Sequence, residues 1–162
     1  MTNHSQPTSL SIYQTKVKPE WIDYNDHMND GYYVVAFTVA TDAVQDHIGL
    51  DEAYRKSTNC TLYTVEAHVT YLREVKVDTN LRFESYVLGV DTKRLHLFHT
   101  MINADEEYVA ATHELMLLHV DQTIGRTAPM PEDMLARTQL LRNEHAQLDL
   151  PDQVGSRIQW KS

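Results

Sequence analysis

GYYVVAFTVATDAVQDHI, residues 31–48, is the stretch from which the architecture of this chain follows. Its apolar side chains return every three or four residues, which predicts an amphipathic helix of about 18 residues and about 27 Å. The members of this apolar face are Tyr33, Ala36, Phe37, Ala40, Ala43, Val44 and Ile48. Asn29 or Asp30 can cap the start of the helix, and Gly49 can end it.

Segments of alternating polar and apolar residues flank this helix. Before it, residues 10–18 predict a first strand that Pro19 ends. After a short polar stretch at 51–57 the period changes to two, which predicts four further strands. Their ranges are 61–73, 81–90, 94–102 and 108–120. Tight turns are expected between these strands, so we expect an antiparallel meander.

One apolar helix face beside one curved antiparallel sheet predicts an α+β fold, in which a five-stranded sheet wraps around one long central helix. Pro129 and Pro131 introduce a last helix at about 131–143. No internal repeat and no Pro/Gly-rich linker divides the 162 residues. We therefore expect a single domain over residues 1–162, with its core at about 10–120.

The charge balance argues against some classes of partner. The chain carries 14 basic and 23 acidic residues, for a formal net charge of −9. Nucleic acids and anionic membranes attract clustered basic residues, so we expect neither as a partner. No apolar run reaches the ~20 residues of a membrane span, and the N-terminus does not resemble a signal peptide. Cys60 is the one cysteine, so no internal disulfide can form. This agrees with a reducing compartment, and we therefore expect a cytoplasmic protein.

Reactive side chains gather just before the helix, in the segment WIDYNDHMNDGYY at residues 21–33. The unpaired amides of a helix N-terminus favour a developing negative charge, so a thioester carbonyl placed against residues 29–31 would gain oxyanion stabilisation. A nearby carboxylate could activate water or attack directly. Asp and Asn before a helix usually serve as caps, however, so these residues alone leave capping and acyl-transfer chemistry both open.

Two motifs resemble those of a known family. Asp23-x-Asn25-x-His27-x-Asn29 resembles the signature of 4-hydroxybenzoyl-CoA-thioesterase-like hotdog proteins, in the form seen in plant acyl-acyl-carrier-protein thioesterases. Tyr71-Leu-Arg-Glu74 is similar to the Tyr-x-Arg-Glu strand segment of that family. The resemblance implies the hotdog fold, an acyl-CoA substrate, no cofactor, and a homodimer or homotetramer. It also implies a catalytic set of Asp23, Asn25, His27 and Glu74.

One departure from the family leaves the role of each carboxylate open. In the bacterial 4-hydroxybenzoyl-CoA branch, the catalytic Asp falls two places after the first Asp, where this chain has Asn25. Asp23, Asp26 and Glu74 therefore remain alternatives for the group that activates water. Asn25 and His27 would hold the geometry.

The acyl group is indicated by a second resemblance. Residues 17–29, 66–68 and 71–74 are similar to the betainyl-CoA thioesterases of bacterial carnitine breakdown, which implies hydrolysis of betainyl-CoA to glycine betaine and CoA. The residues favour the same substrate, because a quaternary ammonium group prefers aromatic faces and negative charge. From residue 19 to 54 there are eight acidic side chains and no Lys or Arg. We expect substrate contacts from Trp21, Tyr24, Asp26, Asn29, Gly31, Tyr33 and Glu66.

Other functions compete with this one. The acidic residues could instead line a solvated loop and the outer helix face, with a neutral short or aromatic acyl-CoA as the substrate. A non-catalytic acyl-CoA-binding protein is a further alternative. An enoyl-CoA hydratase of the same fold would carry Asp-x-Asn-Pro-x-His, and here Asp26 replaces the proline.

The nine histidines do not have the spacing of a metal site. His96 and His99 fall on opposite faces of their strand, and His113 and His119 are separated by about 20 Å along theirs. We therefore expect no metal. Candidate contacts for the CoA nucleotide, in no order, are Arg73, Lys76, Arg82, Lys93 and Arg94.

Overall fold

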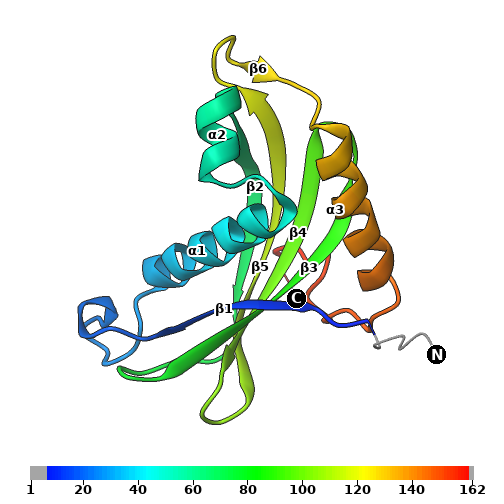
Figure 1. The fold of residues 1–162 in the computed structure, drawn as a ribbon. Coiled ribbons are helices and arrows are strands. Elements are labelled where there is room, and N and C mark those ends of the chain that lie inside the picture. The colour runs from blue at the N-terminus through cyan, green and yellow to red at the C-terminus, as the bar shows by residue number, and fades with distance from the viewer. Residues whose placement is uncertain (1–6, 161–162) are drawn as a thin grey trace, which may run out of the picture.

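The computed structural model describes residues 7–160. A curved antiparallel sheet wraps around one long helix, α1 (Asp30–Ile48), which confirms the predicted α+β architecture (Figure 1). The five main strands are β1 (Leu10–Lys16), β2 (Cys60–Tyr71), β3 (Asn80–Val90), β4 (Arg94–Asn103) and β5 (Tyr108–Asp121). The other elements are η1 (Pro19–Trp21), α2 (Glu52–Thr58), β6 (Arg126–Thr127) and α3 (Glu132–His145).

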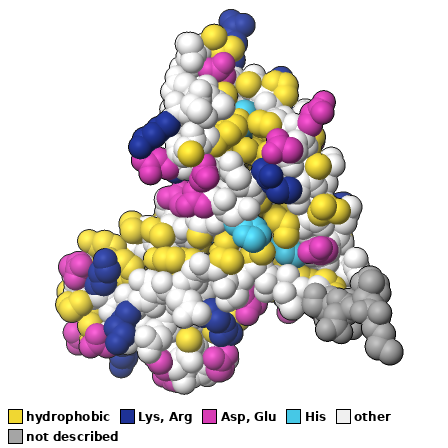
Figure 2. Space-filling model, in the orientation of Figure 1, with side chains coloured by type: hydrophobic (Ala, Val, Ile, Leu, Met, Phe, Trp, Pro, Cys, Tyr) yellow, Lys and Arg dark blue, Asp and Glu magenta, His cyan; other side chains and the backbone are white. Residues whose placement is uncertain are grey.

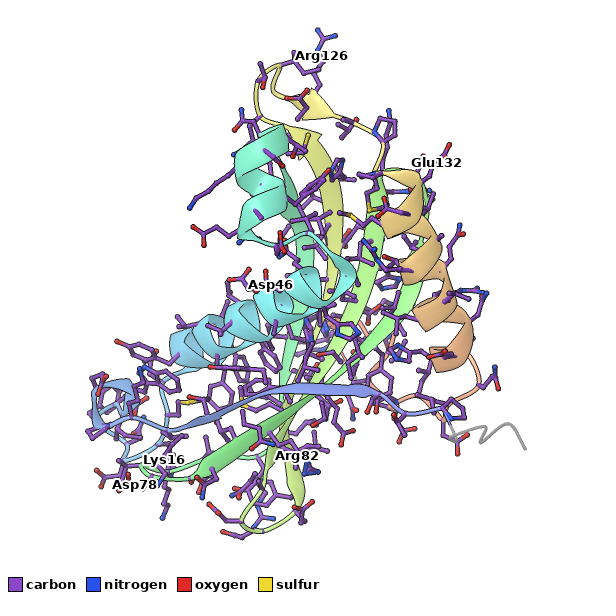
Figure 3. All side chains as sticks on the ribbon, in the orientation of Figure 1. Lys16, Asp46, Asp78, Arg82, Arg126 and Glu132 are labelled. Carbon is purple, nitrogen blue, oxygen red and sulfur yellow. The ribbon has the colours of Figure 1, made fainter. Side chains whose placement is uncertain are left out.

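Helix α1 has the capping residues that its sequence predicts. The Asn29 side chain accepts a hydrogen bond from the Gly31 amide at 3.0 Å, which makes Asn29 the N-cap. Gly49 ends the helix with φ 98°, a left-handed conformation that glycine adopts without a steric penalty. Phe37, Ala40 and Val44 are fully buried on the face that meets the sheet. Side chains from α1 and the sheet fill the space between them (Figure 3).

The strand order is β1-β3-β4-β5-β2, with β6 beside β5. Strands β3, β4 and β5 form a meander, but the prediction that β2 belongs to it is wrong, because β2 pairs with β5 at the far edge from β1. Alternation identifies a strand and its two faces, and it carries no information about which strand lies alongside. The chain therefore has to cross the end of the sheet to reach β3.

Residues 72–79 make this crossing and are tied down on both sides. The Leu72 and Arg73 amides both donate to the Ala110 carbonyl of β5, at 2.9 and 3.0 Å. Val75 is buried, and its carbonyl accepts a hydrogen bond from the Met28 amide at 2.9 Å. The crossing segment is therefore held between β5 and the loop that precedes α1.

Two helices outside the sheet differ from the prediction. Residues 52–58 form α2, where a polar stretch was expected; Asp51 caps it by accepting from the Tyr54 amide at 2.9 Å. Helix α3 forms at the predicted place, but it extends the core past residue 120, because Met130 and Met134 pack in the same cluster as Val44. Within residues 7–160, no helix is long and apolar enough to span a membrane.

Candidate active site

A cleft of about 340 Å³ opens beside the N-terminus of α1. Three parts of the chain form it: the loop before α1, the first turn of α1, and the end of β2 with the crossing segment. Its lining residues are Asp23, His27, Met28, Asp30, Tyr33, Tyr71, Leu72, Arg73 and Glu74. The cleft therefore contains residues from both sequence motifs, which lie more than 40 positions apart in the chain.

The two motifs meet at His27 and Glu74. The His27 Nε2 atom lies 3.2 Å from the Glu74 Oε1 atom, and both side chains are partly exposed. The Glu74 backbone is fixed as well, because the Tyr108 hydroxyl donates to its carbonyl at 2.7 Å. A side chain held in this way can orient an imidazole ring without further rearrangement.

The loop before α1 places its two ends at the cleft and its tip in solvent. The Asp23 Oδ1 atom accepts a hydrogen bond from the Asn25 amide at 2.8 Å, and the Asp23 amide donates to the His27 carbonyl at 3.0 Å. Asp26 adopts a left-handed conformation, φ 61°, which Asp tolerates better than most residues. This tight turn leaves Asp23 and His27 at the cleft and Tyr24, Asn25 and Asp26 exposed at its tip.

The backbone amides at the start of α1 are not equally available. The Gly31 amide donates to the side chains of Asn29 and Asp30, at 3.0 and 2.9 Å. The Asn29 amide donates to the Trp21 carbonyl at 2.9 Å. Among residues 7–160, no acceptor is recorded for the Asp30 amide. Of the amides of residues 29–31, only that of Asp30 remains available to polarise a carbonyl, because the helix cap uses the Gly31 amide and the Trp21 carbonyl accepts from the Asn29 amide.

Tyr33, one of the expected substrate contacts, lines the cleft, but it is not a candidate acid or base. Burial is the main cause that raises the pKa of its hydroxyl to about 12. Tyr33 therefore stays neutral across the physiological range.

Several predicted substrate contacts do not line the cleft. Trp21 is 7 % exposed and stacks on Tyr32 with ring centroids 5.8 Å apart, so it belongs to the core. Tyr24 is 94 % exposed and Asp26 is also exposed, both at the loop tip. Asn29 and Gly31 form the helix cap. Glu66 lines a different hollow together with His68, His96 and Glu114.

Glu66 misses the cleft because of strand alternation. Val69 and Tyr71 of β2 pack on the cluster around α1, or on Tyr33 of α1 itself. Successive side chains of a strand point to opposite faces, so Glu66 and His68 lie on the face turned away from α1. Glu66 therefore does not reach the cleft of its own chain, and a contact with a substrate across a dimer interface stays a prediction.

Tyr71 and Asp30 line the cleft but were not among the predicted site residues. Tyr71 meets the Tyr33 ring edge-on, with centroids 5.2 Å apart and an interplanar angle of 89°. Tyr71 is the first residue of the Tyr-x-Arg-Glu motif, and it lies on the strand face that turns towards α1. That combination could have identified it from the sequence.

Arg73 is the one candidate for binding the CoA nucleotide that lies at the cleft, among the described residues. Its guanidinium carbon lies 3.8 Å from the centre of the Tyr108 ring, and its Nη2 atom lies 3.6 Å from Glu106 Oε2. Arg82 pairs instead with Glu84 and Glu107. No group of three or more potential metal ligands occurs within residues 7–160.

Comparison with known proteins identifies the family and the fold. The family model of the thioesterase-like superfamily matches residues 17–138. The chain is 40 % identical over 146 residues to the betainyl-CoA thioesterase of Pseudomonas aeruginosa, covering 90 % of this chain and 92 % of that protein. A protein of Staphylococcus aureus solved in complex with CoA superimposes with a TM-score of 0.87 at 28 % identity, covering 95 % of this chain and 98 % of that one.

A longer relative matches over one part only. The chain is 43 % identical over 149 residues to the L-carnitine dehydrogenase/betainyl-CoA thioesterase of Agrobacterium fabrum. That match covers 92 % of this chain and 30 % of the longer protein.

Proposed function

Because this chain belongs to the thioesterase-like superfamily, we propose that it hydrolyses betainyl-CoA to glycine betaine and free CoA. The observation that carries the proposal is the His27–Glu74 pair, 3.2 Å apart, which shares a cleft with Asp23 at the N-terminus of α1. In the reaction, water adds to the thioester carbonyl, the carbon–sulfur bond breaks, and the proton released from water passes to the sulfur of CoA.

The cleft residues suggest a division of roles. Asp23 has one carboxylate oxygen bound to the Asn25 amide, and its other oxygen accepts no hydrogen bond from the described residues. Asp23 is therefore the base that takes the proton from water. Glu74 orients His27, and the Asp30 amide stabilises the oxyanion, for which one well-placed donor contributes about 2.7–4 kcal/mol. Asn25 acts through its backbone, because its side chain lies at the exposed loop tip.

Release of free thiol from betainyl-CoA tests this function. Asp23→Asn and His27→Ala are each expected to lower kcat at least about 100-fold while the fold is kept. Asp26→Asn, in the same loop but outside the cleft, is the matched control and should keep most of the activity. Near-wild-type turnover in both cleft variants would rule out these roles.

The substrate is tested with the same assay. Turnover of betainyl-CoA should exceed that of a neutral acyl-CoA of equal size. If the neutral thioester reacts as fast or faster, the substrate is a neutral acyl-CoA. If an acyl-CoA binds without being cleaved, the protein is a non-catalytic acyl-CoA-binding protein.

The compartment proposed for this reaction is the cytoplasm. A CoA thioester as substrate and a free thiol at Cys60 both support it.

A homo-oligomer is part of this proposal. Strand β2 ends the sheet, so one of its edges has no partner strand within residues 7–160. Val65 and Tyr63 of β2 are 55 % and 47 % exposed, and apolar side chains follow the outer face of α1 (Figure 2). The exposed members on α1 are Val34, Val35 and Val39. Exposed apolar side chains on α1 and β2, together with a free strand edge, favour pairing with a second copy, as a dimer or within a tetramer.

Light scattering after gel filtration tests the association. Val65→Lys places a charge on the free edge strand and is expected to convert most of the protein to monomer at micromolar concentration. Ile124→Lys, at an exposed apolar position in the turn after β5, is the control that should leave the mass unchanged. A monomeric wild type, or an unaffected Val65→Lys oligomer, would contradict the proposed interface.

A further inference from the structure

The cleft carries more negative charge than a neutral acyl group would favour. Three carboxylates line it, those of Asp23, Asp30 and Glu74, against the single guanidinium of Arg73. Arg73 is already engaged by the Tyr108 ring and by Glu106, so it offsets little of that charge. CoA is itself an anion, so the surplus acidity does not favour binding of the carrier. It favours a cation on the acyl group.

An aromatic surface lies directly beside these carboxylates. The Tyr71 hydroxyl donates to the Asp30 carbonyl at 3.3 Å, and the ring packs edge-on against Tyr33. Partial burial and the Asp30 charge raise the pKa of Tyr71, so its hydroxyl remains a donor and the ring stays anchored. Tyr71 is nevertheless 49 % exposed, which leaves ring surface available to a ligand in the cleft.

A betainyl group is so short that its positive charge must lie close to the thioester carbonyl. Two single bonds separate the carbonyl carbon from the quaternary nitrogen, a distance of about 2.5 Å. When the carbonyl lies beside His27 and Glu74, the ammonium group must occupy the same cleft. Within that cleft, the aromatic surface is provided by Tyr33, which is buried, and by Tyr71.

We propose that Tyr71 and Asp30 together recognise the quaternary ammonium group of the acyl chain. The Tyr71 ring supplies a π face and the Asp30 carboxylate supplies the opposite charge. This inference rests on the proposed function and adds the residues that determine its specificity. Tyr71 takes the role that the sequence had suggested for Trp21 and Tyr24. Trp21 lies in the core, and Tyr24 lies at the exposed tip of the loop.

Two substrates of the same shape isolate the contribution of the charge. Betainyl-CoA and 3,3-dimethylbutanoyl-CoA differ only in that a neutral carbon replaces the quaternary nitrogen. The quantity measured is the ratio of kcat/KM for the cationic substrate to kcat/KM for the neutral one. Because both carry the same reacting carbonyl, changes in the catalytic groups cancel in this ratio.

Three variants separate the contributions of the Tyr71 ring, the Tyr71 hydroxyl and the Asp30 carboxylate to this ratio. Tyr71→Leu removes the π face and is expected to lower the ratio about tenfold. Tyr71→Phe keeps the π face, so the ratio should change by less than about threefold. Asp30→Asn keeps an oxygen for the Gly31 amide but loses the charge, and it should lower the ratio about tenfold as well. Tyr13→Leu, on β1 outside the cleft, is the control and should not alter it.

The outcomes distinguish this inference from the proposed function. An unchanged ratio in Tyr71→Leu, or equal losses on both substrates, would overturn the recognition role while leaving hydrolysis of betainyl-CoA intact. If the wild type releases thiol from neither substrate, or prefers the neutral one, the proposed function itself fails and the inference fails with it.

Discussion

At the scale of single residues, the cleft contains two carboxylates that sequence reasoning could not separate. Glu74 contacts His27, while Asp23 keeps one oxygen without a partner among the described residues. Glu74→Gln retains the size and an acceptor for His27 but loses the charge. We expect kcat to fall about tenfold, less than in Asp23→Asn, because an orienting group costs less to remove than the base. If Glu74→Gln causes the larger loss in kcat at equal thermal stability, the two roles are reversed.

At the scale of elements, the crossing segment decides whether the site assembles. The Tyr108 hydroxyl anchors this segment at the Glu74 carbonyl. Tyr108→Phe is expected to lower kcat about threefold to tenfold, and unfolding free energy by about 1 kcal/mol. Tyr63→Phe loses a comparable hydroxyl bond, to Gln122 at 2.9 Å, away from the cleft, and should affect stability alone. Equal kcat in the two variants would show that the anchor does not position Glu74.

At the scale of the whole molecule, buried histidines make the fold sensitive to acid. His99 is fully buried between Ser85 and Thr41, and burial lowers its pKa to about 3 and that of His113 to about 4. The unfolded chain takes up these protons near pH 6.5, whereas the folded chain does not. Stability is therefore full above this pH and falls as the pH drops towards 4, by about 1.4 kcal/mol per pH unit for each such histidine.

Urea unfolding at about pH 7.5 and about pH 5 measures this loss. The variant His113→Gln should show a smaller difference between the two pH values than the wild type. His47, which is exposed on α1, provides the control variant His47→Gln with an unchanged difference. An unfolding free energy that is the same at both pH values would contradict the assignment.

The amino-acid sequence by itself determined the elements whose signals are local. The apolar spacing of residues 31–48, the cap Asn29 and the terminator Gly49 specify α1, because a helix depends on side chains three and four positions apart. Alternation likewise specified the strands and correctly placed His96 and His99 on opposite faces. The motifs at residues 23–29 and 71–74 identified the two segments that line the cleft.

Only the tertiary structure decided the strand order and the composition of the cleft. The backbone groups of every strand are alike, so the pairing of β2 with β5 depends on the packing of the whole sheet. The left-handed Asp26 turned Tyr24 away from the cleft, and the helix cap used the Gly31 amide. Tyr71 and Asp30 come together through a contact across 41 positions, which no local pattern encodes.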